Sequence, residues 1–94
     1  MNLNAEEKAV LSLLAIETLR RKVKAEGVGT QKRVARELGE HPTVINRWVL
    51  GKVLPSLHNC NVLLTKYRRY VPKEILINNE YVSKLLEVTE NCQQ

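Results

Sequence analysis

The sequence predicts an all-α fold, a compact helical bundle of about five helices that contains a helix-turn-helix. Apolar residues recur at helical spacing in several segments, and Gly, Pro and capping residues separate these segments at intervals of helix length. No segment shows the alternation of apolar and polar residues that is typical of a strand. A chain of 94 residues, 44% of them apolar, suffices for one domain with a modest core but not for two.

The first helix is expected over residues 5–26. Asn4 precedes it and Glu7 follows three residues later, which is the spacing of a capping box. Gly27 and Gly29 follow the last basic turns and end the helix. The basic cluster at residues 20–22 is expected to be a solvated helix end. Apolar residues recur at helical spacing along the segment: Val10, Leu13, Leu14, Ile16, Leu19 and Val23.

Two short helices are expected next, over residues 31–38 and 42–50. Thr30 is the expected cap of the first, and Gly39 ends it. Pro42 suits the first turn of the second, because the N–H that proline lacks is unbonded there anyway.

These two helices are expected to share one core. The interior positions are Val34, Ala35 and Leu38 in the first, with Ile45, Trp48 and Val49 in the second. The two helices must then cross closely, and the small side chain of Ala35 permits this. The opposite face of the second helix carries Thr43, Asn46 and Arg47 at i, i+3 and i+4.

Three further helices are expected towards the C-terminus. The fourth opens at Ser56 after Pro55, Pro72 begins a short fifth, and Asn79 caps a last one at about 79–92. The fourth carries Leu57, Cys60, Leu64 and Tyr67 on one side. The last carries Tyr81, Leu85, Val88 and Cys92, which we expect to mediate dimerisation. The chain is expected to be a single domain, residues 1–94, with the helix-turn-helix core at about 30–51.

The stretch from residue 31 to residue 56 resembles the helix-turn-helix of the phage-repressor (Cro-like) DNA-binding family without a gap. The matching positions are Gln31, Val34-Ala35, Leu38-Gly39, Ile45, Arg47-Trp48, Gly51-Lys52 and Pro55-Ser56. The chain departs from the family pattern at Glu40, where an aliphatic residue is usual, and at His41, where Ser or Thr is usual.

The resemblance implies a recognition helix that enters the major groove of DNA. Asn and Arg side chains pair bidentately with adenine and guanine edges, and Thr bonds a base or touches a thymine methyl. The expected base-reading residues are Pro42, Thr43, Asn46 and Arg47. The expected contacts to the DNA backbone, which set register without reading sequence, are Gln31, Lys32, Arg33, His41 and Lys52.

The charge distribution agrees with a polyanionic partner. The net charge is +5, and residues 20–52 hold nine basic residues against three acidic ones, whereas the segment from Glu74 onward is acidic. A solvated, lysine-rich surface is the alternative interpretation. Lys66, Arg68 and Arg69 either touch a flanking phosphate or form another solvated helix end.

Other classes of function find little support. His58 and Cys60, with His41 and Cys92, lack the spacing of a zinc site, so neither a metal nor another cofactor is expected. No paired carboxylates or nucleophile with a base indicate an enzyme. No apolar run is long enough for a membrane span or resembles an export signal, so a cytoplasmic protein with reduced cysteines is expected.

The leading hypothesis is a sequence-specific regulator of transcription that binds double-stranded DNA, a repressor of phage or mobile-element type. One recognition helix covers few base pairs, so a homodimer or higher homo-oligomer on a palindromic operator is expected. The alternative is a helical protein-interaction module, an antitoxin or adaptor, that uses the same scaffold without reading DNA sequence.

Overall fold

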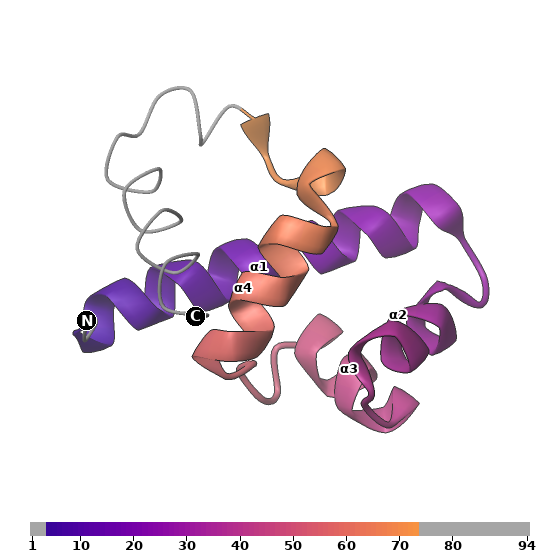
Figure 1. Ribbon diagram of the computed structural model, residues 1–94, viewed down its shortest axis with the longest axis horizontal. Helices are drawn as coiled ribbons and strands as arrows, with labels where there is room; N and C mark the ends of the chain where they lie inside the picture. Colours follow the sequence, from indigo (N-terminus) through magenta and orange to yellow (C-terminus); the bar gives the residue numbers. More distant parts are fainter. Residues whose placement is uncertain (1–3, 74–94) are drawn as a thin grey trace.

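The computed structural model of the protein describes residues 4–73, and these residues form an all-α fold as the sequence predicts. The elements are α1 (Ala5–Glu26), α2 (Thr30–Leu38), α3 (Pro42–Val49), α4 (Leu57–Lys66) and a short 3-10 helix, η1 (Arg68–Tyr70). In Figure 1, α4 crosses α1, and α2 and α3 lie together near the C-terminal half of α1. None of the helices within residues 4–73 is both long and apolar enough to span a membrane.

α1 is one continuous helix of 22 residues that begins with the predicted capping box. The Glu7 N–H donates to Asn4 Oδ1 at 2.8 Å, and the Asn4 N–H donates to Glu7 Oε1 at 3.0 Å. Each side chain therefore satisfies an N–H group that the helix itself leaves unpaired.

The turn between α1 and α2 differs from the prediction at Thr30. Thr30 is the first residue of α2 rather than its cap, and the capping residue is Gly29 with φ 90°. The buried Thr30 hydroxyl donates backwards to the Gly27 carbonyl at 2.6 Å and accepts from Arg33 Nη2 at 3.0 Å, so it bonds to the preceding turn and to a side chain rather than to a backbone N–H of α2. Gly27 also has positive φ, and this Gly-Val-Gly turn therefore depends on both glycines.

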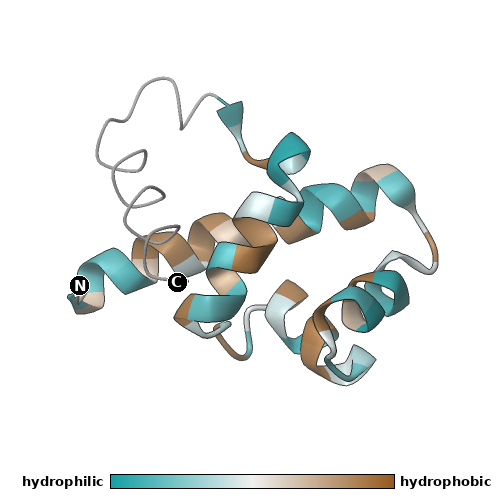
Figure 2. Cartoon of the chain, viewed as in Figure 1, coloured by the Kyte–Doolittle hydropathy of each residue, from teal (hydrophilic) through white to brown (hydrophobic). Residues whose placement is uncertain are grey.

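All four helices contribute to a single core. Figure 2 shows apolar segments on the facing sides of the helices. The buried apolar side chains are Leu11, Leu14, Ala15, Ile16, Leu19, Val34, Ala35, Ile45, Trp48, Cys60, Leu63, Leu64, Tyr67 and Val71. Leu38 and Val49 are partly buried against this core. The predicted interior of the α2–α3 pair is therefore confirmed.

One residue of the apolar pattern of α1 is exposed, and one prediction for this helix was wrong. Leu13 is 64% exposed, because it lies on the solvent-facing stripe of α1 with Glu17 and Arg20. Lys22, expected at a solvated helix end, is 9% exposed, because its ammonium pairs with Glu26 and lies beside the rings of Tyr67 and Tyr70. A long amine can be buried when it is paired in this way.

The C-terminal half agrees with the sequence as far as it is described. The Asn59 N–H donates to Ser56 Oγ at 3.2 Å, which confirms Ser56 as the cap of α4. η1 was not predicted. The helix expected from Pro72 lies almost entirely outside the described residues. The predicted last helix, with the dimerisation candidates Tyr81, Leu85, Val88 and Cys92, lies wholly outside them.

Candidate nucleic-acid interface

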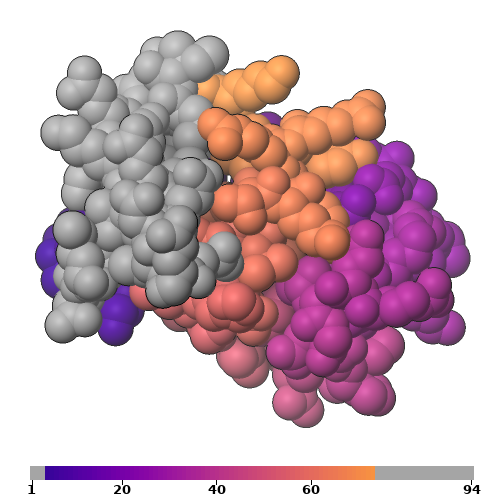
Figure 3. Space-filling view, in the orientation of Figure 1, coloured from indigo at the N-terminus to yellow at the C-terminus, as the bar shows by residue number. Residues whose placement is uncertain are grey.

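α3 has one buried face and one polar, exposed face. Ile45 is fully buried and Trp48 is 3% exposed, whereas Thr43, Asn46 and Arg47 are all exposed. Ala35 of α2 is 1% exposed and belongs to the same core cluster as Ile45 and Trp48. The α2–α3 segment, in magenta, forms one continuous end of the molecular surface in Figure 3. The three polar side chains predicted to read bases therefore face outward together.

His41 caps the N-terminus of α3. The Thr43 N–H donates to His41 Nδ1 at 3.1 Å, and the His41 carbonyl accepts from the Val44 N–H at 2.9 Å. His41 thus performs the role of the Ser or Thr that the family pattern has here. Because Nδ1 is engaged, a contact from His41 to DNA would have to use Nε2.

Arg20 holds the C-terminus of α3. Its Nε donates to the Val49 carbonyl at 2.7 Å, although the two residues are 29 positions apart. Carbonyls at a helix C-terminus lack intrahelical partners and carry partial negative charge, so a cation is favourable there. Arg20 was expected at a solvated helix end, and its contact with Val49 was not predicted.

The residues predicted to contact the DNA backbone fall into two groups. Gln31 and Lys32 lie in the first turn of α2 and line an open groove, and Lys52 is exposed just after α3. Arg33, in contrast, is already engaged. Its Nη2 lies 3.2 Å from Glu26 Oε1 and 3.0 Å from Thr30 Oγ1, so it stabilises the α1–α2 turn.

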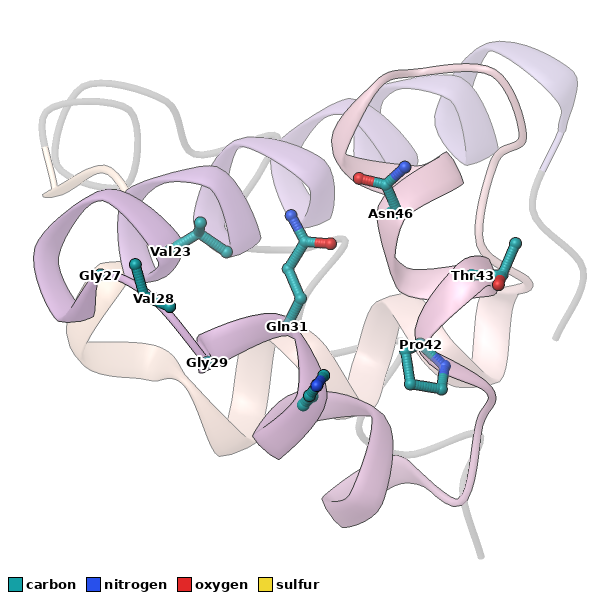
Figure 4. A pocket seen from close by; sticks show the side chains of 9 residues that line it. Val23, Gly27, Val28, Gly29, Gln31, Pro42, Thr43 and Asn46 are labelled. Carbon is teal, nitrogen blue, oxygen red and sulfur yellow. The ribbon is translucent and has the colours of Figure 1, made fainter.

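The groove, of about 700 Å³, lies between the α1–α2 turn and the N-termini of α2 and α3. Figure 4 shows Gln31 between Val23 and Val28 on one side and Asn46, Thr43 and Pro42 on the other. The described residues that line it are Val23, Gly27, Val28, Gly29, Gln31, Lys32, Pro42, Thr43 and Asn46. The groove is therefore lined by two predicted contacts to the DNA backbone and by three predicted base-reading residues. Two valines also line it, and the sequence did not predict them as site residues.

A cluster of charged and polar side chains lies at the C-terminal end of α1, next to the α1–α2 turn that lines the groove. Glu26 Oε2 accepts from Lys22 Nζ and from the Tyr70 hydroxyl, both at 2.7 Å, and its other oxygen faces Arg33. The Lys22 bond, followed by the Tyr70 bond, lowers the pKa of Glu26 from 4.5 to about 2. Lys22 Nζ also lies 4.6 Å from the centroid of the Tyr67 ring. The cluster ties α1, α2 and η1 together.

Cys60 is a buried free thiol whose pKa is raised by burial, so it is a core residue and not a reactive one. Residues 4–73 contain no group of three His, Cys, Asp or Glu side chains placed to hold a metal ion.

No protein-family model matches the chain, and no curated protein or solved structure is significantly similar to it. The functional interpretation therefore depends on the geometry of this surface and on the resemblance of residues 31–56.

Proposed function

We propose that the protein is a sequence-specific regulator of transcription, a repressor of phage or mobile-element type, that reads the major groove of double-stranded DNA with α3. One observation supports this above all. The exposed face of α3 carries Thr43, Asn46 and Arg47, while the opposite face is locked into the core by Ile45 and Trp48. Such a helix presents donors and acceptors for base edges on a rigid support.

The surroundings of α3 suit contact with phosphates. Lys32 and Lys52 are exposed at the two ends of the α2–α3 unit, and the N-terminus of α2 has no side-chain cap. Cations on both sides of a recognition helix fix its register on the duplex without reading sequence. A homodimer on a palindromic site would double the few base pairs that one α3 covers.

Selection from random duplexes tests this function directly. The proposed function predicts recovery of a discrete site, with two related half-sites about one helical turn apart, and affinity for it about a thousandfold or more above that for scrambled DNA. Recovery of unrelated sequences bound with equal affinity would contradict it.

One observation favours the alternative, a protein-interaction module. Three large apolar side chains of the α3–α4 connection are about half exposed: Leu50 (53%), Val53 (46%) and Leu54 (54%). If this surface is the functional one, replacing Leu54 by Ser would abolish partner binding while leaving DNA affinity unchanged. The proposed regulator predicts instead that substitutions in α3 affect DNA binding most.

A further inference from the structure

The groove beside α3 has an apolar rim that the proposed contacts do not use. Val28 is fully exposed at the tip of the Gly-Val-Gly turn, and Val23 and Pro42 line the same groove. A single exposed aliphatic residue needs no special explanation. Val28 and Pro42, however, are both exposed and border one groove with the partly buried Val23. The volume of this groove lies within the roughly 300–1,000 Å³ range of ligand sites, and its rim indicates an apolar occupant.

The charge of the side chains that line the groove indicates which class of ligand can bind there. Among the described residues that line it, Lys32 is the only charged one, and no carboxylate is present. The remaining polar side chains, those of Gln31, Thr43 and Asn46, can each donate a hydrogen bond. The occupant should therefore combine a negative charge with an apolar surface, which a DNA strand does through its phosphate and its sugar.

The residues across the groove lie in an order that the sugars, phosphates and bases of a DNA strand can follow. The proposed phosphate contact Gln31 borders one part, and the proposed base readers, Thr43 and Asn46, border another. Gln31 lies between these base readers and the two valines. Each phosphate of a DNA strand lies between two sugars, so a phosphate bound at Gln31 leaves one sugar on the side of Val28. In B-form DNA, moreover, the C2′ methylene of deoxyribose faces the major groove.

We propose that this groove binds a deoxyribose of the operator, with its C2′ methylene packed against Val28 and the neighbouring apolar rim. The inference rests on the proposed function, since it needs duplex DNA seated on α3. It adds the α1–α2 turn to the interface and makes one sugar, in addition to bases and phosphates, a determinant of affinity.

Replacing single nucleotides by arabinonucleotides tests the contact. An arabinonucleotide keeps the base and the phosphate and adds one hydroxyl at C2′ that points into the major groove. The probe is the duplex recovered by selection, substituted at one position at a time. A hydroxyl pressed against Val28 without a partner should weaken binding by roughly 5- to 100-fold at one position in each half-site.

A variant of Val28 then identifies the residue responsible. Val28→Thr has nearly the same shape and offers a hydrogen-bonding partner, so the penalty at that position should shrink by roughly threefold or more. Val53→Thr is the matched control, because Val53 is an exposed valine that does not line the groove. It should leave the penalty unchanged. Val28 is fully exposed and Val53 is about half exposed, so neither substitution should unfold the protein, and thermal melts verify this.

The outcomes separate the inference from the function it rests on. A position-specific penalty that Val28→Thr relieves supports the inference. The sugar contact is refuted, and the proposed function stands, if the selected duplex binds tightly but an arabinonucleotide weakens binding at no position. The same conclusion follows if the arabinonucleotide penalty is equal in the wild type and in Val28→Thr. If no preferred duplex is recovered, both are refuted.

Discussion

Arg20 in α1 donates a 2.7 Å hydrogen bond to the carbonyl of Val49, the last residue of α3. This contact links the longest helix of the described fold to the end of the helix that carries Thr43, Asn46 and Arg47. Because Ile45 and Trp48 anchor the same helix in the core, α3 is held both along its buried face and at its C-terminus. A helix that reads base edges needs this rigidity, since it must present its side chains in one orientation.

Replacement of Arg20 by Ala should therefore destabilise the protein by about 1 kcal/mol, since the bond is charge-assisted but exposed. Chemical denaturation measures the loss. Lys24→Ala is the control, because it removes the same charge from an exposed position on the same helix. Equal losses in the two variants would show that the charge matters and not the contact with Val49.

Replacement of Lys52 by Ala should weaken DNA binding for all sequences to a similar degree. The proposed contact is to a phosphate, so the slope of log K against log salt should fall by about one. Binding by the wild type should itself weaken by roughly a thousandfold between about 50 and 200 mM salt if six or more phosphates are contacted. Lys8→Ala, an exposed lysine near the start of α1, should leave the slope unchanged. A loss confined to one base position would assign Lys52 to base reading instead.

Glu26 should make stability depend on pH in the acid range. Its folded pKa is lowered from 4.5 to about 2 by Lys22 and Tyr70, so its contribution is fully present above pH 4.5 and is lost as the pH falls towards 2. The difference in melting temperature between the wild type and Glu26→Gln should therefore be largest at pH 5 and above and should vanish near pH 2. A difference that is constant across this range would mean that the charge of Glu26 does not stabilise the fold.

Asn61 is a buried polar residue of α4 whose Oδ1 has no hydrogen-bond partner among the described residues. Leu has a similar size and no polar group, so Asn61→Leu should raise the free energy of unfolding by about 1 kcal/mol. Asn61→Asp should lower it, because a charge would be buried without a partner. Destabilisation by both substitutions would indicate that the amide makes a contact that stabilises the native state.

Features that depend on near neighbours in the chain were predicted well. The capping box of Asn4 and Glu7 and the cap at Ser56 are encoded within three residues. The outward face of α3 also followed from helical periodicity, since placing Ile45 and Trp48 inside leaves Asn46 outside.

Features that depend on distant packing were missed. Lys22 is buried and Leu13 is exposed, the reverse of what polarity alone would give, because the rings of Tyr67 and Tyr70 lie beside the Lys22 ammonium. The contact between Arg20 and Val49 joins α1 to α3, and the packing of these two helices cannot be inferred from the sequence. One local feature was also predicted wrongly: Thr30 was assigned as a cap, whereas a hydroxyl beside a helix start can donate to the preceding turn, here to Gly27, instead of accepting from the helix.

The effect of Arg47→Ala on affinity, measured against every single-base variant of the selected site, is the most direct test of α3 as a reading helix. The proposed function predicts a loss of about 1–3 kcal/mol that is concentrated at one base pair of each half-site, where discrimination disappears. Arg36→Ala, an exposed arginine in the last turn of α2, serves as the matched control. Unchanged affinity and unchanged base preference in Arg47→Ala would contradict a reading role for this face of α3.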